Sequence, residues 1–174
     1  MGNRKKLILN ILQIFKTHNI EYLILSNIES NSIEGDVDIL IQKKFKLIRR
    51  VLINKLKEAG VNVLMEKKGL AKNTTLSIYS THFNQTLRID LYEDIVLTSN
   101  KTYPIIYSLN SQNFFISKDL DKEGFFKPSK ENLFIYLLFR KLLKEDYSIK
   151  TQNHLKSIIE EIKLINPKFK INIL

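Results

Sequence analysis

The sequence predicts an α/β fold, or α+β by stricter counting: a small mixed β-sheet with helices packed on one face and a C-terminal helical segment closing one side. Two observations predict it. Apolar residues recur at helical spacing around residues 4–17 and 45–59, and short runs typical of strands follow each of these segments. A helical pattern returns after Pro128, so we divide the chain into a core at 1–127 and a C-terminal helical segment at 128–174 that packs on it.

The elements of the core follow from where the apolar and the chain-breaking residues stand. Gly60 occupies the position expected for the C-terminal cap of the second helix, because glycine adopts the left-handed conformation there easily. The polar residues 82–85 predict a hairpin connection between two strands. In chain order we expect strands at 22–25, 36–41, 61–65, 76–79 and 87–91.

Beyond Asp94 the pattern weakens. We expect short β-prone pieces at 103–107 and 113–116, and a charged, solvent-exposed stretch at 118–123. Ser129 is the expected N-cap of the next helix, and the last helix must end before Pro167, which cannot continue it.

Composition narrows the class of protein. With 174 residues, of which 44% are hydrophobic, the chain can bury one core. The absence of cysteine excludes disulfides and thiolate chemistry, and three scattered histidines argue against a structural zinc site. No apolar run reaches the roughly 20 residues of a membrane span, and the N-terminus lacks the apolar core of a signal peptide, so we expect a cytoplasmic protein.

The net positive charge favours negatively charged partners but does not indicate which kind. The chain has 28 Lys and Arg against 18 Asp and Glu, a formal net charge of +10, which favours phosphorylated or polyanionic partners, nucleic acid among them. Much of the excess is lysine spread along helices, however, and a solvated surface explains it at least as well.

Residues 35–41 place two carboxylates in an apolar run, a pattern that indicates a functional site. Side chains alternate along a strand, so Asp36 and Asp38 share one face and the apolar residues between and after them face the core. At about 3.3 Å of rise per residue, their Cα atoms lie roughly 6–7 Å apart, close enough for both carboxylates to approach one cation. Two like charges on a half-buried strand need such a compensating positive charge.

A second acidic strand strengthens this reading. In residues 87–92 the alternation sends Leu87, Ile89 and Leu91 inward and leaves Asp90 and its neighbours on the other face. If this strand lies beside the first, Asp90 becomes a third ligand. Three carboxylates suit Mg²⁺ or Mn²⁺, which takes its remaining ligands from water and substrate phosphates, and this favours phosphoryl or nucleotidyl transfer.

These motifs, taken in order, resemble a known family. The succession of Ser26-Asn27, then residues 35–39, and later residues 89–91 is similar to the DNA polymerase β-like nucleotidyltransferase superfamily, and within it to a minimal bacterial nucleotidyltransferase-like group. The resemblance covers about the first hundred residues. It implies a nucleotidyltransferase-like catalytic core at 1–127 in which Asp36 and Asp38 bind both metal ions, while Asp90 completes one metal site and helps to activate the attacking hydroxyl.

The resemblance also implies residues that hold the nucleotide. Ser26 and Asn27 stand where the family has the Gly-Ser that cradles the phosphates, so we expect weakened rather than absent NTP binding. Gly35 gives the backbone freedom before the acidic strand. Arg88 shares the face of Asp90, where it either holds a substrate phosphate or forms an ion pair with Asp90 or Asp36.

The function expected from these residues is metal-dependent transfer of a nucleoside monophosphate from an NTP to an unidentified acceptor: RNA, a protein or a glycan precursor. Two alternatives stay open: a nucleotide- or RNA-binding module that has lost turnover, and an antitoxin-like partner protein of the same fold. Arg140 and Lys141 either reach over the cleft towards a base or phosphate or belong to a helix whose aromatic residues pack the core. The chain has no Walker or dinucleotide-binding loop.

Overall fold

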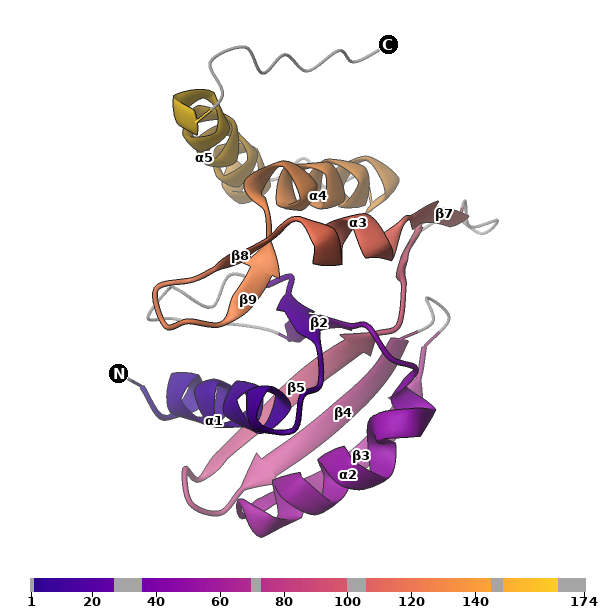
Figure 1. Cartoon of the computed structure of the whole chain (residues 1–174), viewed down its shortest axis with the longest axis vertical. Coiled ribbons are helices and arrows are strands. Elements are labelled where there is room, and N and C mark those ends of the chain that lie inside the picture. The colour runs from indigo at the N-terminus through magenta and orange to yellow at the C-terminus, as the bar shows by residue number, and fades with distance from the viewer. Residues whose placement is uncertain (1, 27–35, 70–72, 100–105, 145–148, 166–174) are drawn as a thin grey trace.

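A computed structural model describes residues 2–26, 36–69, 73–99, 106–144 and 149–165 (Figure 1). Its centre is a mixed five-stranded sheet of strand order β1-β2-β5-β4-β3. Strands β2 and β5 are parallel, and the other neighbours are antiparallel. The bounds of these strands are β1 (Tyr22–Ile24), β2 (Val37–Ile41), β3 (Val61–Lys68), β4 (Asn73–Ser80) and β5 (Gln85–Tyr92). The mixed sheet and its helices confirm the predicted α+β class.

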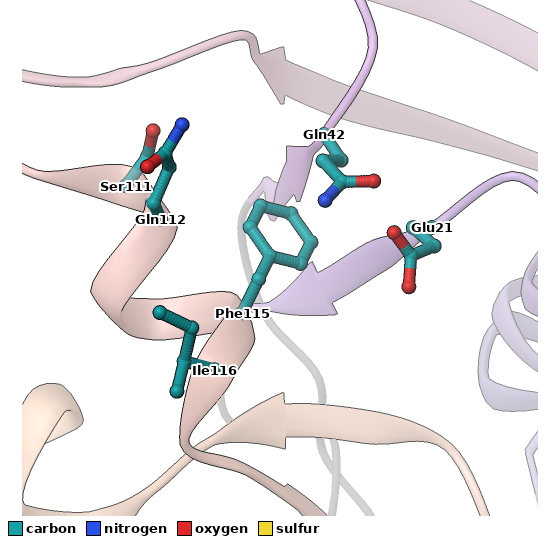
Figure 2. A pocket seen from close by; sticks show the side chains of 6 residues that line it. All are labelled: Glu21, Gln42, Ser111, Gln112, Phe115 and Ile116. Carbon is teal, nitrogen blue, oxygen red and sulfur yellow. The ribbon is translucent and has the colours of Figure 1, made fainter.

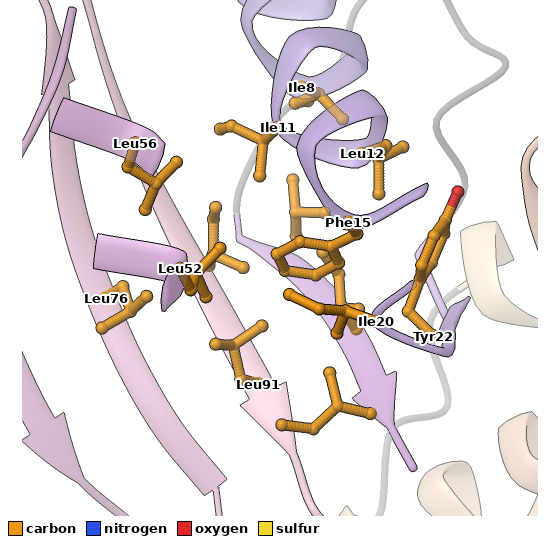
Figure 3. Close-up of a cluster of buried hydrophobic side chains, with 14 of the residues drawn as sticks. Ile8, Ile11, Leu12, Phe15, Ile20, Tyr22, Leu52, Leu56, Leu76 and Leu91 are labelled. Carbon is orange, nitrogen blue, oxygen red and sulfur yellow. The ribbon is translucent and has the colours of Figure 1, made fainter. Parts of the chain in front are cut away.

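Two helices, α1 (Asn3–Thr17) and α2 (Phe45–Glu58), cover one face of the sheet (Figure 1). Their apolar residues interdigitate with the inward side chains of β2, β4 and β5 in a first apolar cluster (Figure 3). The cluster is fully buried at its centre and supplies the main hydrophobic stabilisation of the fold. It includes Leu7, Ile8, Ile11, Leu12, Phe15, Ile20, Tyr22, Val37, Ile39, Ile41, Leu52, Leu56, Leu76 and Leu91.

The other face of β1 and β2 carries a second apolar cluster. Leu23, Leu25 and Leu40 lie there with Phe114, Phe115 and Tyr136 from two later helices. A third apolar cluster joins the last two helices to each other through Phe134, Leu155, Ile158 and Ile162. The described elements after β5 are β6 (Ile95–Thr98), β7 (Ile106–Leu109), α3 (Ser111–Ile116), β8 (Lys118–Leu120), β9 (Phe126–Pro128), α4 (Lys130–Lys144) and α5 (Ile149–Ile165).

Helix α4 begins, and helix α5 ends, where the sequence predicts. The Ser129 hydroxyl accepts a hydrogen bond from the backbone N–H of Asn132 at 3.4 Å, which confirms it as the N-cap of α4. Helix α5 ends at Ile165, ahead of Pro167. Among the helices that the structure describes, none combines the length and the apolar character needed to cross a membrane.

The prediction of a β-prone piece at 113–116 is wrong, because these residues belong to helix α3. The Asn110 side chain accepts a hydrogen bond from the Gln112 backbone N–H at 3.0 Å and so caps the helix, while Phe114 and Phe115 enter the second cluster. The charged stretch at 118–123 begins with strand β8, which pairs with β9. Of the piece predicted at 103–107, residues 103–105 lie outside the described residues, and β7 contains the rest.

Candidate functional site

The two acidic strands lie side by side, which is the condition under which Asp90 joins the carboxylates of β2. Asp38 on β2 and Asp90 on β5 are direct Cα partners across the parallel pair. Val37, Ile39 and Ile89 point into the first cluster, so the alternation of each strand directs both carboxylates to the opposite face. Each aspartate is only 7% exposed. Asp36 stands directly before β2 and is exposed.

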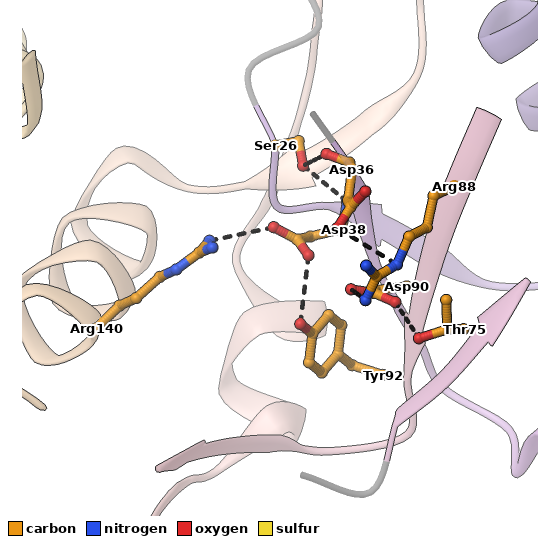
Figure 4. Close-up of polar contacts among 8 residues, drawn as sticks. All are labelled: Ser26, Asp36, Asp38, Thr75, Arg88, Asp90, Tyr92 and Arg140. Atoms are coloured by element: carbon orange, nitrogen blue, oxygen red, sulfur yellow. Dashed lines mark hydrogen bonds and ion pairs between the residues drawn. The ribbon is translucent and has the colours of Figure 1, made fainter. Parts of the chain in front are cut away.

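Asp38 has a different contact on each carboxylate oxygen (Figure 4). Its Oδ1 accepts a hydrogen bond from the Tyr92 hydroxyl at 3.3 Å, and its Oδ2 accepts one from Arg140 Nη1 at 3.1 Å. Tyr92 comes from the neighbouring strand β5, whereas Arg140 comes from α4 in the C-terminal segment. The same Arg140 nitrogen donates to the Tyr136 hydroxyl at 3.3 Å, and its guanidinium lies 5.9 Å from the centre of the Tyr136 ring.

Asp90 is held from the other side of β5. The hydroxyl of Thr75, a buried residue of the adjacent strand β4, donates a hydrogen bond to Asp90 Oδ1. Thr75 is the direct register partner of Asp90, and Lys67 on β3 is in turn the partner of Thr75. One row of register partners therefore runs across four strands from Lys67 to Asp38.

Arg88 lies between two carboxylates of the site, those of Asp36 and Asp90. Its Nε lies 3.4 Å from Asp36 Oδ2, and its Nη2 lies 3.8 Å from Asp90 Oδ2. The Arg88 side chain is 54% exposed, and exposed pairs at such distances contribute little to stability. Of the two roles that the sequence left open for Arg88, the ion pair is thus present with both carboxylates, and its weakness leaves the guanidinium available to a ligand.

Ser26 lies next to the aspartates but holds the backbone. Its hydroxyl accepts a hydrogen bond from the Asp38 backbone N–H at 2.7 Å and donates one to the Asp36 carbonyl oxygen at 3.4 Å. These contacts join the end of β1 to the start of β2 and fix the position of both acidic residues. The other two residues that the sequence assigns to nucleotide binding, Asn27 and Gly35, lie outside the described residues.

Burial and neighbouring charges shift the pKa values of the three residues around Asp38, which are Tyr92, Tyr136 and Arg140. Burial, followed by the negative charge of Asp38, raises the pKa of Tyr92 well above its usual range, and burial raises the pKa of Tyr136 to about 12. Burial alone would lower the pKa of Arg140, but Tyr136 and Asp38 together raise it above its usual value. At neutral pH, Asp38 therefore faces a neutral phenol and a charged guanidinium.

The donor chemistry of the site fits a hard divalent cation, because its three carboxylates offer only oxygen atoms. In the structure, however, each of these carboxylates contacts an arginine side chain. Within the described ranges, no three His, Cys, Asp or Glu side chains form a group that could hold a metal ion. Instead, Arg88 contacts Asp36 and Asp90, and Arg140 contacts Asp38. A cation shared by the carboxylates would have to replace these guanidinium contacts.

Sequence reasoning did not find the hydroxyl donors of the site. The alternation of β5 placed Tyr92 on the acidic face, but its bond to Asp38 depends on the parallel register of β2 and β5. Thr75 carries no signal in the sequence beyond its place in a strand. Arg140 was a candidate for a cation reaching over the cleft, and its contact with Asp38 joins residues 102 positions apart.

A separate open pocket of about 360 Å³ lies at the other end of the β1–β2 pair. Figure 2 shows the ring of Phe115 between Glu21 and Gln42 on one side and the start of α3 on the other. Glu21 precedes β1 and Gln42 follows β2, whereas Asp38 lies near the start of β2. The pocket is therefore distinct from the acidic site.

No protein-family model and no curated protein sequence matches this chain.

Proposed function

We propose that the protein is a metal-dependent nucleotidyltransferase that moves a nucleoside monophosphate from an NTP to an acceptor: RNA, a protein or a glycan precursor. The observation that carries the proposal is the direct pairing of Asp38 with Asp90 on adjacent parallel strands, with Asp36 two residues before Asp38. Carboxylates placed in this way, at the edge of an apolar core and close to solvent through Asp36, suit Mg²⁺ or Mn²⁺ together with substrate phosphates.

In this proposal Asp36, Asp38 and Asp90 would hold the metal, which when bound supplies charge neutralisation at the phosphates and a lower pKa for the acceptor hydroxyl. The other residues orient these three. Thr75 and Tyr92 hold the carboxylates by hydrogen bonds from their hydroxyls, and Arg88 offers a partly exposed guanidinium to a phosphate. Such in-line displacement needs positioning and charge more than covalent help from the protein.

The second candidate is a nucleotide- or RNA-binding module without turnover. Two observations favour it: arginines already neutralise the carboxylates, and the Ser26 hydroxyl is committed to backbone atoms instead of a phosphate. The net charge of +10 fits either candidate.

Label transfer separates the two candidates. The protein would be incubated with labelled NTPs, Mg²⁺ or Mn²⁺, and a pool of cellular RNA, proteins and glycans. We expect slow, strictly metal-dependent transfer that Asp38→Asn and Asp90→Asn abolish. Asp119→Asn is the matched control, because Asp119 is an exposed carboxylate on β8, outside the acidic site.

Tight nucleotide or RNA binding without label transfer or pyrophosphate release would contradict the proposed enzyme and support the binding module. Transfer that persists in both aspartate variants would show that the reaction takes place elsewhere and would overturn the assignment of the site.

A further inference from the structure

Arg140 occupies the position that a cation would take on Asp38. Its Nη1 lies 3.1 Å from Asp38 Oδ2, and the Asp38 side chain is only 9% exposed. The Arg140 side chain is 36% exposed, so one side of the ion pair faces solvent. Two positive ions crowded onto one carboxylate oxygen repel each other. A divalent cation that binds Oδ2 of Asp38 would therefore displace Arg140 from it.

The structure offers Arg140 a way to leave without moving its helix. Helix α4 is anchored in the second cluster by Leu133, Tyr136 and Leu137, whereas the Arg140 side chain is only partly buried. Its hydrogen bonds within the described residues, to Asp38 and to Tyr136, both use Nη1. Among the residues that the structure describes, no group accepts a hydrogen bond from Nε or Nη2, and a guanidinium matches the oxygens of a phosphate group.

We propose that Arg140 exchanges partners when substrate binds. In the free protein it neutralises Asp38; when a divalent cation takes Asp38, Arg140 turns to a phosphate of the nucleoside triphosphate that arrives with the cation. This inference rests on the proposed function and adds a phosphate-binding residue to its site. It also assigns a role to the C-terminal segment, since α4 supplies the guanidinium that contacts Asp38 on β2.

The exchange predicts opposite effects on two affinities when the charge is removed. Arg140→Met keeps an unbranched side chain but has no cation. Titration calorimetry would measure binding of Mn²⁺ alone, and then of a non-hydrolysable NTP in the presence of Mn²⁺. We expect Mn²⁺ alone to bind about tenfold more tightly, because its competitor is gone, and the NTP to bind about tenfold more weakly, because a charged hydrogen bond to phosphate is lost.

Arg50→Met is the matched control, because Arg50 is exposed on α2, the helix that covers the opposite face of the sheet. It removes the same charge and should change neither affinity more than about twofold, the screening effect expected of a remote surface charge. Arg140→Lys provides a second test that keeps the charge. Its affinity for Mn²⁺ alone should stay near that of the natural protein, while its NTP affinity falls because an ammonium group lacks the guanidinium fork.

Affinities for Mn²⁺ and NTP that move in the same direction in Arg140→Met, or do not move, would overturn the exchange and leave Arg140 a structural ion-pair partner. A rise in Mn²⁺ affinity in Arg140→Lys equal to that in Arg140→Met would also overturn it, because charge would not be the cause. If the natural protein binds neither Mn²⁺ nor the NTP, the proposed function itself fails, and the exchange fails with it.

Discussion

At the scale of single residues, the acidic site depends on donors that reach carboxylates inside a sheet. A buried carboxylate must receive hydrogen bonds, because the water that would solvate it is absent. Asp90 receives one from the Thr75 hydroxyl, and Asp38 receives one from Tyr92 and one from Arg140. The donors come from β4, β5 and α4, so the site is assembled from segments far apart in the chain.

Thr75→Val tests this dependence directly. Valine has nearly the shape of threonine but lacks the hydroxyl, so Asp90 would lose its donor inside the sheet. We expect the free energy of unfolding to fall by about 1–3 kcal/mol, the usual cost of leaving a buried polar group unsatisfied, measured by urea denaturation at neutral pH. Thr75→Ser keeps the hydroxyl and serves as the control. A Val variant as stable as the Ser variant would show that the hydroxyl does not support Asp90.

The sequence predicted the acidic residues of the site better than their partners. Asp36, Asp38 and Asp90 could be placed on one face from strand alternation alone, because each strand also carries an uninterrupted apolar face. The contact of Arg140 with Asp38 could not be predicted, since it depends on how α4 packs against the sheet and not on any local pattern.

At the scale of elements, long periodic segments were predicted well and short ones were not. Helices α1 and α2 match their predicted positions because their buried residues recur at helical spacing. Helix α3 has only six residues, too few to display a helical period, and its two phenylalanines favour a strand by propensity. Its structure is decided by the Asn110 cap and by the burial of both rings in the second cluster.

The end of α2 gives a test at this scale. Gly60 follows the C-cap Ala59 and has a φ of +71°, the left-handed conformation that the sequence predicted for a capping glycine. Gly60→Ala should lower the free energy of unfolding by about 1–2 kcal/mol in urea denaturation, because a side chain is disfavoured at this φ. The nearest atom to the added Cβ, Thr81 Oγ1 at 3.6 Å, leaves room for it, so the cost is conformational and not steric.

Gly2→Ala is the control for this prediction. Gly2 precedes α1 with a φ of −68°, and an added Cβ meets nothing within 4 Å. Gly2 is the N-cap of α1, where glycine is preferred over alanine, so its substitution should cost at most about 1 kcal/mol, less than Gly60→Ala. Equal effects at both glycines would show that the left-handed conformation of Gly60 carries no cost for alanine.

At the scale of the whole molecule, the three apolar clusters are connected to one another. Phe126 packs against both the first and the second cluster, and Leu133 and Leu137 pack against both the second and the third. The C-terminal segment thus shares apolar side chains with the core at 1–127 that the sequence delimited. Because unfolding α4 would expose the face of β1 and β2 that it covers, we expect the core and the segment to unfold together.

This cooperativity can be tested with a pair of truncations in distant clusters. Leu12 lies at the centre of the first cluster and Ile162 at the centre of the third, and both are fully buried. Leu12→Ala and Ile162→Ala should each lower the free energy of unfolding by about 2–5 kcal/mol. Both should shift the midpoint of a single transition that far-ultraviolet circular dichroism and tyrosine fluorescence report alike.

Leu164→Ala separates loss of packing from a general effect of alanine on α5, because Leu164 is 85% exposed on the same helix. It should leave the midpoint almost unchanged. A separate early transition in Ile162→Ala, with the remaining transition unaltered, would show that the last two helices unfold independently of the sheet. Helix α4, which carries Arg140, would then detach from Asp38 as part of an independent unit. The exchange of partners by the Arg140 side chain alone requires that α4 stay fixed, and therefore requires a single transition.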